Sequence, residues 1–165
     1  MQCYCGSAKP FDLCCHTFIS GQVQVSYCEQ LMRSRYSAYC HKAIDYIYQT
    51  YHPSMRQENP AAALAAFAHD SHFIKLDVHN AEQSVKEGFV EFTVKYMQHN
   101  LLYQFRERSR FVLEDRWYYL NGILMEQTPR KIQRNDQCPC NSGKKFKQCQ
   151  LSFLQCMKHL VQYDG

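Results

Sequence analysis

The sequence predicts an α+β fold, because helical patterns fill the first part of the chain and strand patterns the second. Apolar residues recur at helical spacing over residues 27–52, which indicates one amphipathic helix or a helix pair that Pro53 closes. Pro60 opens an alanine-rich second helix. After residue 72 the chain is rich in β-branched and aromatic residues, in four runs separated by short turns. Four such strands form an antiparallel, curved sheet, and helices followed by a sheet give α+β.

The expected turns between the strands lie at Glu87-Gly88, Gln98 to Asn100 and Glu114-Asp115. Within the third strand the pleat separates an aromatic face with Phe105, Glu107 and Phe111 from a face that carries three arginines. The arginines are Arg106, Arg108 and Arg110. They form either a solvated face, a surface for a partner, or a surface covered by a helix that supplies acids.

Length and composition predict one core with small appendages in a reducing compartment. The chain has 165 residues, a net charge of +4 and ten cysteines. Its start has no basic segment followed by an apolar one, and no apolar run reaches the roughly 18 residues that span a bilayer. We therefore expect a cytoplasmic protein without a transmembrane segment, in which clustered cysteines indicate a metal rather than disulfides. Cys28 and Cys40 lie apart from the clusters and are expected in the core.

The N-terminal cysteines are spaced for a tetrahedral metal site. Zinc takes four thiolates readily, and Cys3, Cys5, Cys14 and Cys15 offer four within 15 residues. Gly6 can adopt a positive φ that folds the chain back over the metal, and His16 is a substitute ligand. A segment this short buries no core, so the metal must supply its folding energy.

The C-terminal end repeats this pattern with one ligand missing. CYCGSAKPFDLC and CPCNSGKKFKQC align without a gap, and Cys138, Cys140 and Cys149 match three of the four ligands. Gln150 holds the fourth position, and a carboxamide is a poor zinc ligand. Cys156 lies seven residues after Cys149, about 10 Å along a helix, which is too far to close the shell. We expect a second site that is vacant, weak or three-coordinate.

The C-terminal segment is also the basic one. Lys144, Lys145 and Lys147 form a patch that suits an acidic protein, ribosomal RNA or anionic lipid, unless it is simply a solvated tail. No recognition helix or base-reading motif accompanies the patch, so we expect no sequence-specific binding of nucleic acid.

These motifs resemble known ones. CYCGSAKPFDLCCH and CPCNSGKKFKQC are similar to the SEC-C metal-binding motif, also found at the C-terminus of the SecA translocation motor. LMRSRYSAY, ERSRF and WYY resemble the YchJ family, in which SEC-C motifs flank a central domain. The resemblance implies a nuclear-transport-factor-2-like (NTF2-like) cone, with helices packed on a curved sheet. It also implies zinc at Cys3, Cys5, Cys14 and Cys15, with iron accepted at SecA-like sites.

The chain then divides into three parts. They are a SEC-C zinc module over residues 1–22, an NTF2-like domain over residues 27–130, and a degenerate SEC-C module with a helical tail over residues 134–165.

Two classes of function follow from these features. The first is a zinc-stabilised adaptor that docks a protein or ribosome-associated partner. The second is a small-molecule-binding or catalytic cone, for which Arg35, Asp45, His52 and Glu107 are the candidate pocket residues. No nucleophile motif, phosphate loop or HExxH site appears, which favours a binding protein over an enzyme.

Overall fold

The computed structural model of the protein describes residues 1–126 and 129–149. Four α-helices precede the sheet: α1 (Cys15–Ile19), α2 (Cys28–His41), α3 (Ile44–Gln49) and α4 (Ala61–Asp70). Residues 27–52 therefore form a helix pair, and Lys42 ends α2 in the left-handed region with φ 59°. Among the described residues there are also three short 3-10 turns, η1 (Phe11–Leu13), η2 (Pro53–Met55) and η3 (Phe146–Gln148). Pro60 stands immediately before α4, as its sequence position predicted.

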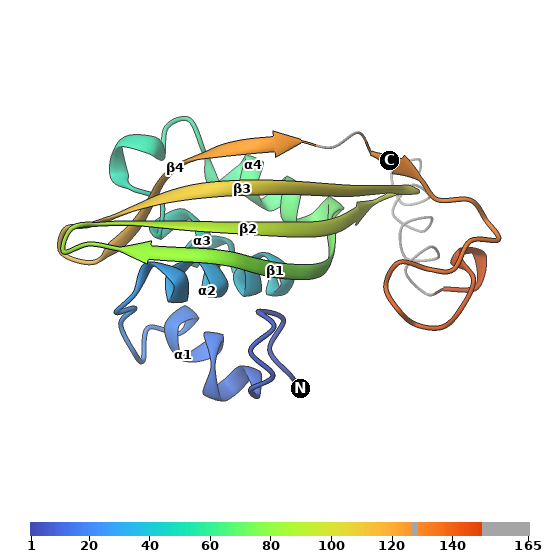
Figure 1. Cartoon of the computed structure of the whole chain (residues 1–165), viewed down its shortest axis with the longest axis horizontal. Coiled ribbons are helices and arrows are strands. Elements are labelled where there is room, and N and C mark those ends of the chain that lie inside the picture. Colours follow the sequence, from blue (N-terminus) through green and yellow to red (C-terminus); the bar gives the residue numbers. More distant parts are fainter. Residues whose placement is uncertain (127–128, 150–165) are drawn as a thin grey trace, which may run out of the picture.

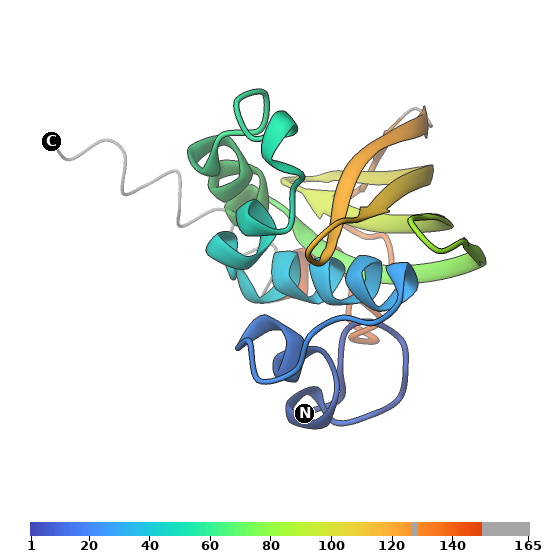
Figure 2. The same cartoon turned by 90° about the vertical axis from the view of Figure 1, so that its left-hand side faces the viewer.

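The strands form one antiparallel sheet. Its order is β1 (His72–Gln83), β2 (Glu87–Gln98), β3 (Leu101–Leu113) and β4 (Trp117–Glu126), and β5 (Arg130–Lys131) pairs with the start of β3. The helices lie against one face of this curved sheet, and the N-terminal segment lies beneath α2 (Figure 1, Figure 2). The predicted α+β class and the NTF2-like cone are confirmed.

One predicted turn is wrong. The β1–β2 connection lies at Ser84 to Lys86, closed by a 2.7 Å hydrogen bond from the Ser84 amide to the Glu87 carbonyl. Gly88 instead lies inside β2, where a Cβ would stand 2.5 Å from Cys28 Sγ on α2. The lack of a side chain at Gly88 allows α2 and β2 to approach closely, and Gly88 does not form a turn.

The main core lies between α2 and the inner face of the sheet. It includes Leu31, Val90, Phe111 and Trp117, all nearly inaccessible to solvent. On the outer face the three arginines of β3 pair with acids of other strands: Arg106 with Glu91 and Arg110 with Glu87 on the adjacent β2, and Arg108 with Glu82 on β1. The row is a solvated face with cross-strand ion pairs, and no helix covers it in the part of the chain described.

Candidate functional site

The four N-terminal thiols converge on one point. One sulfur from each of Cys3, Cys5, Cys14 and Cys15 lies within 4.8 Å of the others. Cys5 Sγ is 3.6 Å from Cys14 Sγ, and Cys14 Sγ is 4.0 Å from Cys15 Sγ. Four sulfurs bonded to one zinc at about 2.3 Å in a tetrahedron stand about 3.8 Å apart. The cluster therefore fits a tetrahedral metal ion without rearrangement.

Local backbone geometry brings these thiols together. Gly6 takes φ 77° and Ala8 φ 59°, so the chain turns back, and the Cys3 amide donates to the Lys9 carbonyl at 2.8 Å. The 3-10 turn η1 then presents Cys14, and α1 begins at Cys15. The predicted positive φ at Gly6 is confirmed, whereas the one at Ala8 carried no glycine signal in the sequence.

The cluster is packed onto the central domain through α2. Cys3 Sγ lies 3.3 Å from Ser37 Oγ, and Arg33 donates to the Cys5 carbonyl at 2.6 Å. The ring of Phe11 stacks on that of His41 with centroids 3.9 Å apart. Cys3, Cys5 and Cys15 are buried in this contact. A metal held here would be a structural centre shielded from solvent.

Crowding perturbs the ionisation of the four thiols. A hydrogen bond from Cys15 is the main cause that lowers the pKa of Cys5 to about 4, and the same bond raises the pKa of Cys15. Burial is the main cause that raises the pKa of Cys14. One thiol thus loses its proton easily, whereas its neighbours do not, because they would place further negative charges beside the first. A bound divalent cation would favour deprotonation of the neighbouring thiols as well.

The C-terminal cluster reproduces the same loop. Asn141 takes φ 59° and Gly143 φ 71°, and the Cys138 amide donates to the Lys144 carbonyl at 2.9 Å. Cys140 Sγ lies 3.5 Å from Cys149 Sγ and 3.2 Å from Cys138 Sγ. The three sulfurs lie within 4.8 Å of one another.

This second module is anchored at the far end of the sheet (Figure 1). Phe146, Ile132, Cys138 and Cys149 pack on Met97. Burial raises the pKa of Cys138 to about 12. For Cys140, burial is outweighed by hydrogen bonds with Ser142 and Cys138, and the pKa falls to about 7. Gln150 and Cys156, which bear on the fourth ligand, lie outside the described residues.

The lysines of the C-terminal patch project from this module. Lys144, Lys145 and Lys147 are exposed, and Phe146 between them is buried in the module core. Asp136 pairs with Arg130 at 3.6 Å. Its negative charge therefore neutralises an arginine and not one of the three lysines of the patch.

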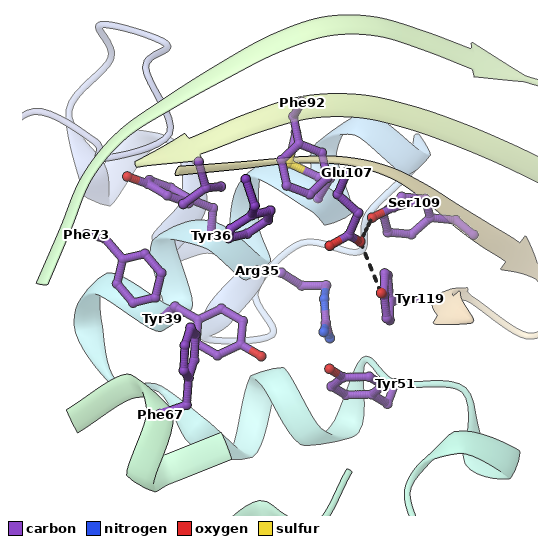
Figure 3. A pocket seen from close by; sticks show the side chains of 14 residues that line it. Arg35, Tyr36, Tyr39, Tyr51, Phe67, Phe73, Phe92, Glu107, Ser109 and Tyr119 are labelled. Atoms are coloured by element: carbon purple, nitrogen blue, oxygen red, sulfur yellow. Dashed lines mark hydrogen bonds between the residues drawn. The ribbon is translucent and has the colours of Figure 1, made fainter. Parts of the chain in front are cut away.

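A separate cavity of about 200 Å³ lies between the helices and the inner face of the sheet. Aromatic side chains from every layer line it, among them Tyr36, Phe67, Phe92 and Tyr119 (Figure 3). Burial is the main cause that raises the pKa of Tyr36, Tyr39 and Tyr119, so these rings stay neutral. The two charged residues that line the cavity are Arg35 and Glu107.

Arg35 is tied to the end of α3. It is only 6% exposed, and its Nη1 donates to the Ile47 carbonyl at 2.8 Å and to Thr50 Oγ1 at 2.7 Å. Its guanidinium carbon lies 4.3 Å from the centroid of the Tyr51 ring and 4.7 Å from that of Tyr119. Cation–π contacts and the carbonyl together compensate for the buried charge.

Glu107 is held by hydroxyl groups. Its Oε1 accepts from Ser109 Oγ and, at 3.1 Å, from the Tyr119 hydroxyl. Gly122 makes this orientation feasible, because a Cβ there would lie 2.8 Å from the carboxyl carbon of Glu107. The period-two pattern of β3 predicts Phe105, Glu107 and Phe111 on one face, and all three line the cavity.

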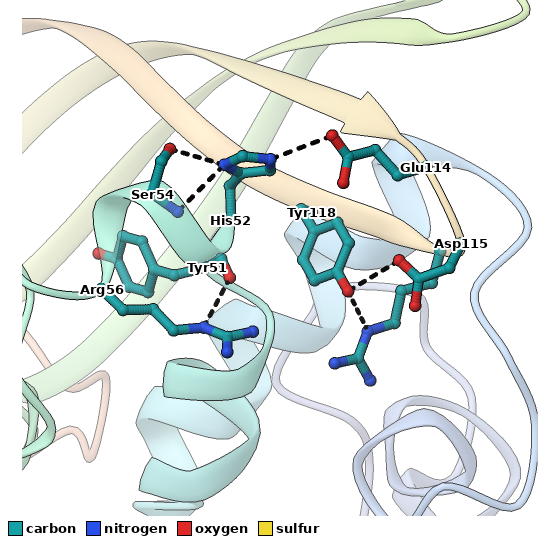
Figure 4. Close-up of polar contacts among 8 residues, drawn as sticks. Tyr51, His52, Ser54, Arg56, Glu114, Asp115 and Tyr118 are labelled. Atoms are coloured by element: carbon teal, nitrogen blue, oxygen red, sulfur yellow. Dashed lines mark hydrogen bonds and ion pairs between the residues drawn. The ribbon is translucent and has the colours of Figure 1, made fainter.

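The other two candidate pocket residues lie elsewhere. Asp45 is exposed in the first turn of α3 and is not among the residues that line the cavity. His52 contacts Ser54 through Nδ1 and lies 3.2 Å from Glu114 through Nε2, beside the ring of Tyr118 (Figure 4). Tyr51 and Tyr119, which flank Arg35, had not been singled out; their contact depends on segments far apart in sequence.

Comparisons with known proteins agree with this architecture. The family model described as "YchJ, middle NTF2-like domain" matches residues 27–122, and that of the SEC-C motif matches residues 134–149. A UPF0225 protein of Enterobacter sp. (strain 638) is 39% identical over 150 residues, covering 89% of this chain and 95% of that protein. A UPF0225 protein of Vibrio vulnificus (strain YJ016) is 41% identical over 162 residues, covering 89% and 96%.

Two solved structures are similar. A SEC-C motif containing protein from Rhodopseudomonas palustris has a TM-score of 0.70 and 34% identity, covering 74% of this chain and 98% of that one. A SEC-C motif containing protein from Psychrobacter arcticus shares the fold, with a TM-score of 0.66 and 23% identity over 93% of this chain and 97% of that one. Among the described residues, no helix is both long and apolar enough to cross a membrane.

Proposed function

This chain belongs to the YchJ family, and on that premise we propose that it is a zinc-binding adaptor. The convergence of four sulfurs from Cys3, Cys5, Cys14 and Cys15 carries the proposal of zinc. Four thiolates leave no open coordination position, so the ion acts in structure and not in catalysis. Its role is to hold the N-terminal module on α2.

The C-terminal module is the docking element of this proposal. Its three exposed lysines stand on a loop that is packed on the sheet through Phe146. A compact cationic surface of this kind attracts an acidic protein or a ribosome-associated partner over roughly a Debye length of 10 Å. Binding should therefore weaken as the salt concentration rises.

Metal content tests the zinc assignment. Native mass spectrometry and elemental analysis of the full chain should find one tightly held zinc ion per molecule. The Cys14→Ser variant should lose it, whereas Cys40→Ser, which changes a half-buried thiol of α2 outside both clusters, should retain it. Two equally retained ions would contradict the asymmetry between the modules, and a tightly held iron ion would replace zinc in the assignment.

Charge reversal tests the docking role. In pull-downs and in cosedimentation with ribosomes, Lys144→Glu, Lys145→Glu and Lys147→Glu combined should remove the bound partner. The matched control reverses three exposed lysines elsewhere, Lys9, Lys75 and Lys86. Equal loss of binding in both triple variants would show a non-specific effect of net charge and would contradict the docking role.

A second function, binding of a small molecule within the cone, is supported by a different observation. The cavity places Arg35 and Glu107 among aromatic walls, at a size of about 200 Å³. Concave, mostly apolar sites with a few polar groups are typical of ligand pockets. A compound that occupies the cavity should raise the melting temperature of the protein, and above its dissociation constant the rise should follow the logarithm of the ligand concentration.

A further inference from the structure

The two charges of the cavity differ in how completely the protein itself satisfies them. The guanidinium of Arg35 donates to Ile47 and Thr50 and lies between two tyrosine rings. Those contacts come from the end of α3 and from β4 and fix the side chain against one wall. The protein's own groups therefore hold the guanidinium of Arg35 beside Tyr51 and Tyr119 (Figure 3).

Glu107 has a different arrangement. Both of its hydrogen bonds, from Ser109 and from Tyr119, end on the same oxygen, Oε1. The other oxygen, Oε2, points toward the space between the aromatic walls (Figure 3). A carboxylate oxygen accepts hydrogen bonds strongly, and its interaction with a donor is strengthened by the low dielectric of a buried site.

Residues of β3 and β4 set this orientation of the Glu107 carboxylate. β3 presents Glu107 and Ser109 two residues apart on one face, and the bulge in β4 pairing brings Tyr119 alongside. Gly122, opposite Ser109, leaves the space that the carboxyl group fills. A side chain at position 122 would displace the carboxylate, so its inward position depends on this glycine.

The walls restrict the shape of the guest. Phe92, Phe67, Tyr36 and Tyr39 present ring faces and edges to the cavity, which suit a flat aromatic molecule in offset or edge contact. An apolar cavity of about 150 Å³ accommodates benzene. A cavity of about 200 Å³ therefore suits one or two fused rings. Because the lining carries one cationic and one anionic side chain, Arg35 and Glu107, a neutral guest leaves the net charge of the cavity at zero.

We propose that the cavity binds a small, neutral, one- or two-ring aromatic molecule that donates an N–H hydrogen bond to Glu107 Oε2. This inference rests on the second function proposed above and specifies its ligand chemistry. Glu107 selects the donor, the aromatic walls select the flat ring, and Arg35 supplies charge balance without contacting the donor group.

The test compares two molecules of the same shape on the full, metal-loaded chain. Indole carries an N–H group, and indene carries a CH₂ in its place. By calorimetry and ligand-detected NMR, indole should bind roughly tenfold more tightly than indene, the difference expected for one hydrogen bond to a charged acceptor. Benzoate, an anion of similar size, should not bind.

Variants locate the contact. Glu107→Gln keeps the shape but replaces the charged acceptor by an amide, and it should lower the affinity for indole several-fold while leaving that for indene unchanged. The matched control, Glu114→Gln, changes an exposed glutamate that pairs with His52 and should alter neither. Melting curves of both variants confirm that they are folded.

The outcomes separate the two levels of the proposal. Equal binding of indole and indene would overturn the role of Glu107 and leave small-molecule binding intact. Binding of benzoate in place of indole would overturn the assignment of charge and donor. Failure of indole, indene and benzoate alike to bind would overturn both this inference and the second function from which it proceeds.

Discussion

At the scale of single residues, the two terminal modules differ in which loop position carries a side chain in the left-handed region. In the N-terminal loop the two positive φ values fall on Gly6 and Ala8, and in the C-terminal loop they fall on Asn141 and Gly143. Asparagine tolerates this region, whereas alanine there is destabilised by roughly 1 kcal/mol. The four-thiol module therefore holds a strained residue that its three-thiol counterpart lacks.

Replacing Ala8 by glycine should relieve this strain. Because a small metal module folds with its ion, the gain should appear as tighter zinc binding, about two- to fivefold after the greater freedom of glycine in the unfolded chain is offset. Competition with a chromophoric chelator measures the change. Ala8→Ser retains a Cβ and should bring no gain; an equal gain from serine would show that strain at this position is not the cause.

At the scale of elements, the sequence determined helix and strand order but not how closely the elements approach. Periodicity located the helix pair over 27–52 and the inner face of β3, because repeat spacing is a local property. Glycine is a turn signal, so the sequence predicts a turn at Gly88, and only the position of Cys28 across the interface reveals its packing role. Likewise, the contact of Arg35 with Tyr119 depends on the tertiary arrangement.

The contact between α2 and β2 predicts a specific double-mutant result. Gly88→Ala places a methyl group 2.5 Å from Cys28 Sγ and should lower the free energy of unfolding by about 1–3 kcal/mol. Cys28→Gly removes both the sulfur and the Cβ of Cys28, which stands 2.7 Å from the added methyl group, and in that background the Gly88→Ala change should be much less harmful. Urea denaturation of the four proteins measures the coupling. Additive effects would mean that the helix shifts away and that the Cys28 side chain is not the obstacle.

At the scale of the whole molecule, the two modules hold different parts of one domain. The N-terminal module covers the outer side of α2 through Ser37, Arg33 and His41, while the C-terminal module packs on Met97 at the end of β2. α2 is consequently enclosed between the first module and the sheet. Loss of one module should therefore destabilise only the part of the domain that it contacts. This part is α2 for the N-terminal module and the end of β2 for the C-terminal module.

The interface of the first module should be sensitive to acid through His41. Burial is the main cause that lowers the pKa of this residue, and its Nε2 is buried without a hydrogen-bond partner. The folded protein resists a proton that the unfolded chain accepts, so the contribution is fully present above the unfolded pKa of about 6.5 and is lost as the pH falls through the folded value.

Melting temperatures between pH 7.5 and 5.5 measure this contribution. His41→Phe keeps the ring stack on Phe11 but cannot be protonated, so it should lose less stability on acidification than the wild type. Protonation of the zinc thiolates affects both proteins and cancels in the difference. The control His79→Phe changes an exposed histidine of β1 and should follow the wild-type curve; parallel curves for His41→Phe and wild type would exclude a role for His41.

Removal of the metal tests the division of labour between the modules. Cys14→Ser or chelation should raise hydrogen exchange along α2, because the module that covers Ser37 and His41 folds only with its ion. Exchange at the Met97 end of β2 should stay unchanged. Cys149→Ser should give the reverse pattern, since Cys149 packs with Met97 and Phe146. If metal loss left α2 fully protected, the zinc module would be an independent appendage, and its attachment to the helix would contribute nothing to the stability of the domain.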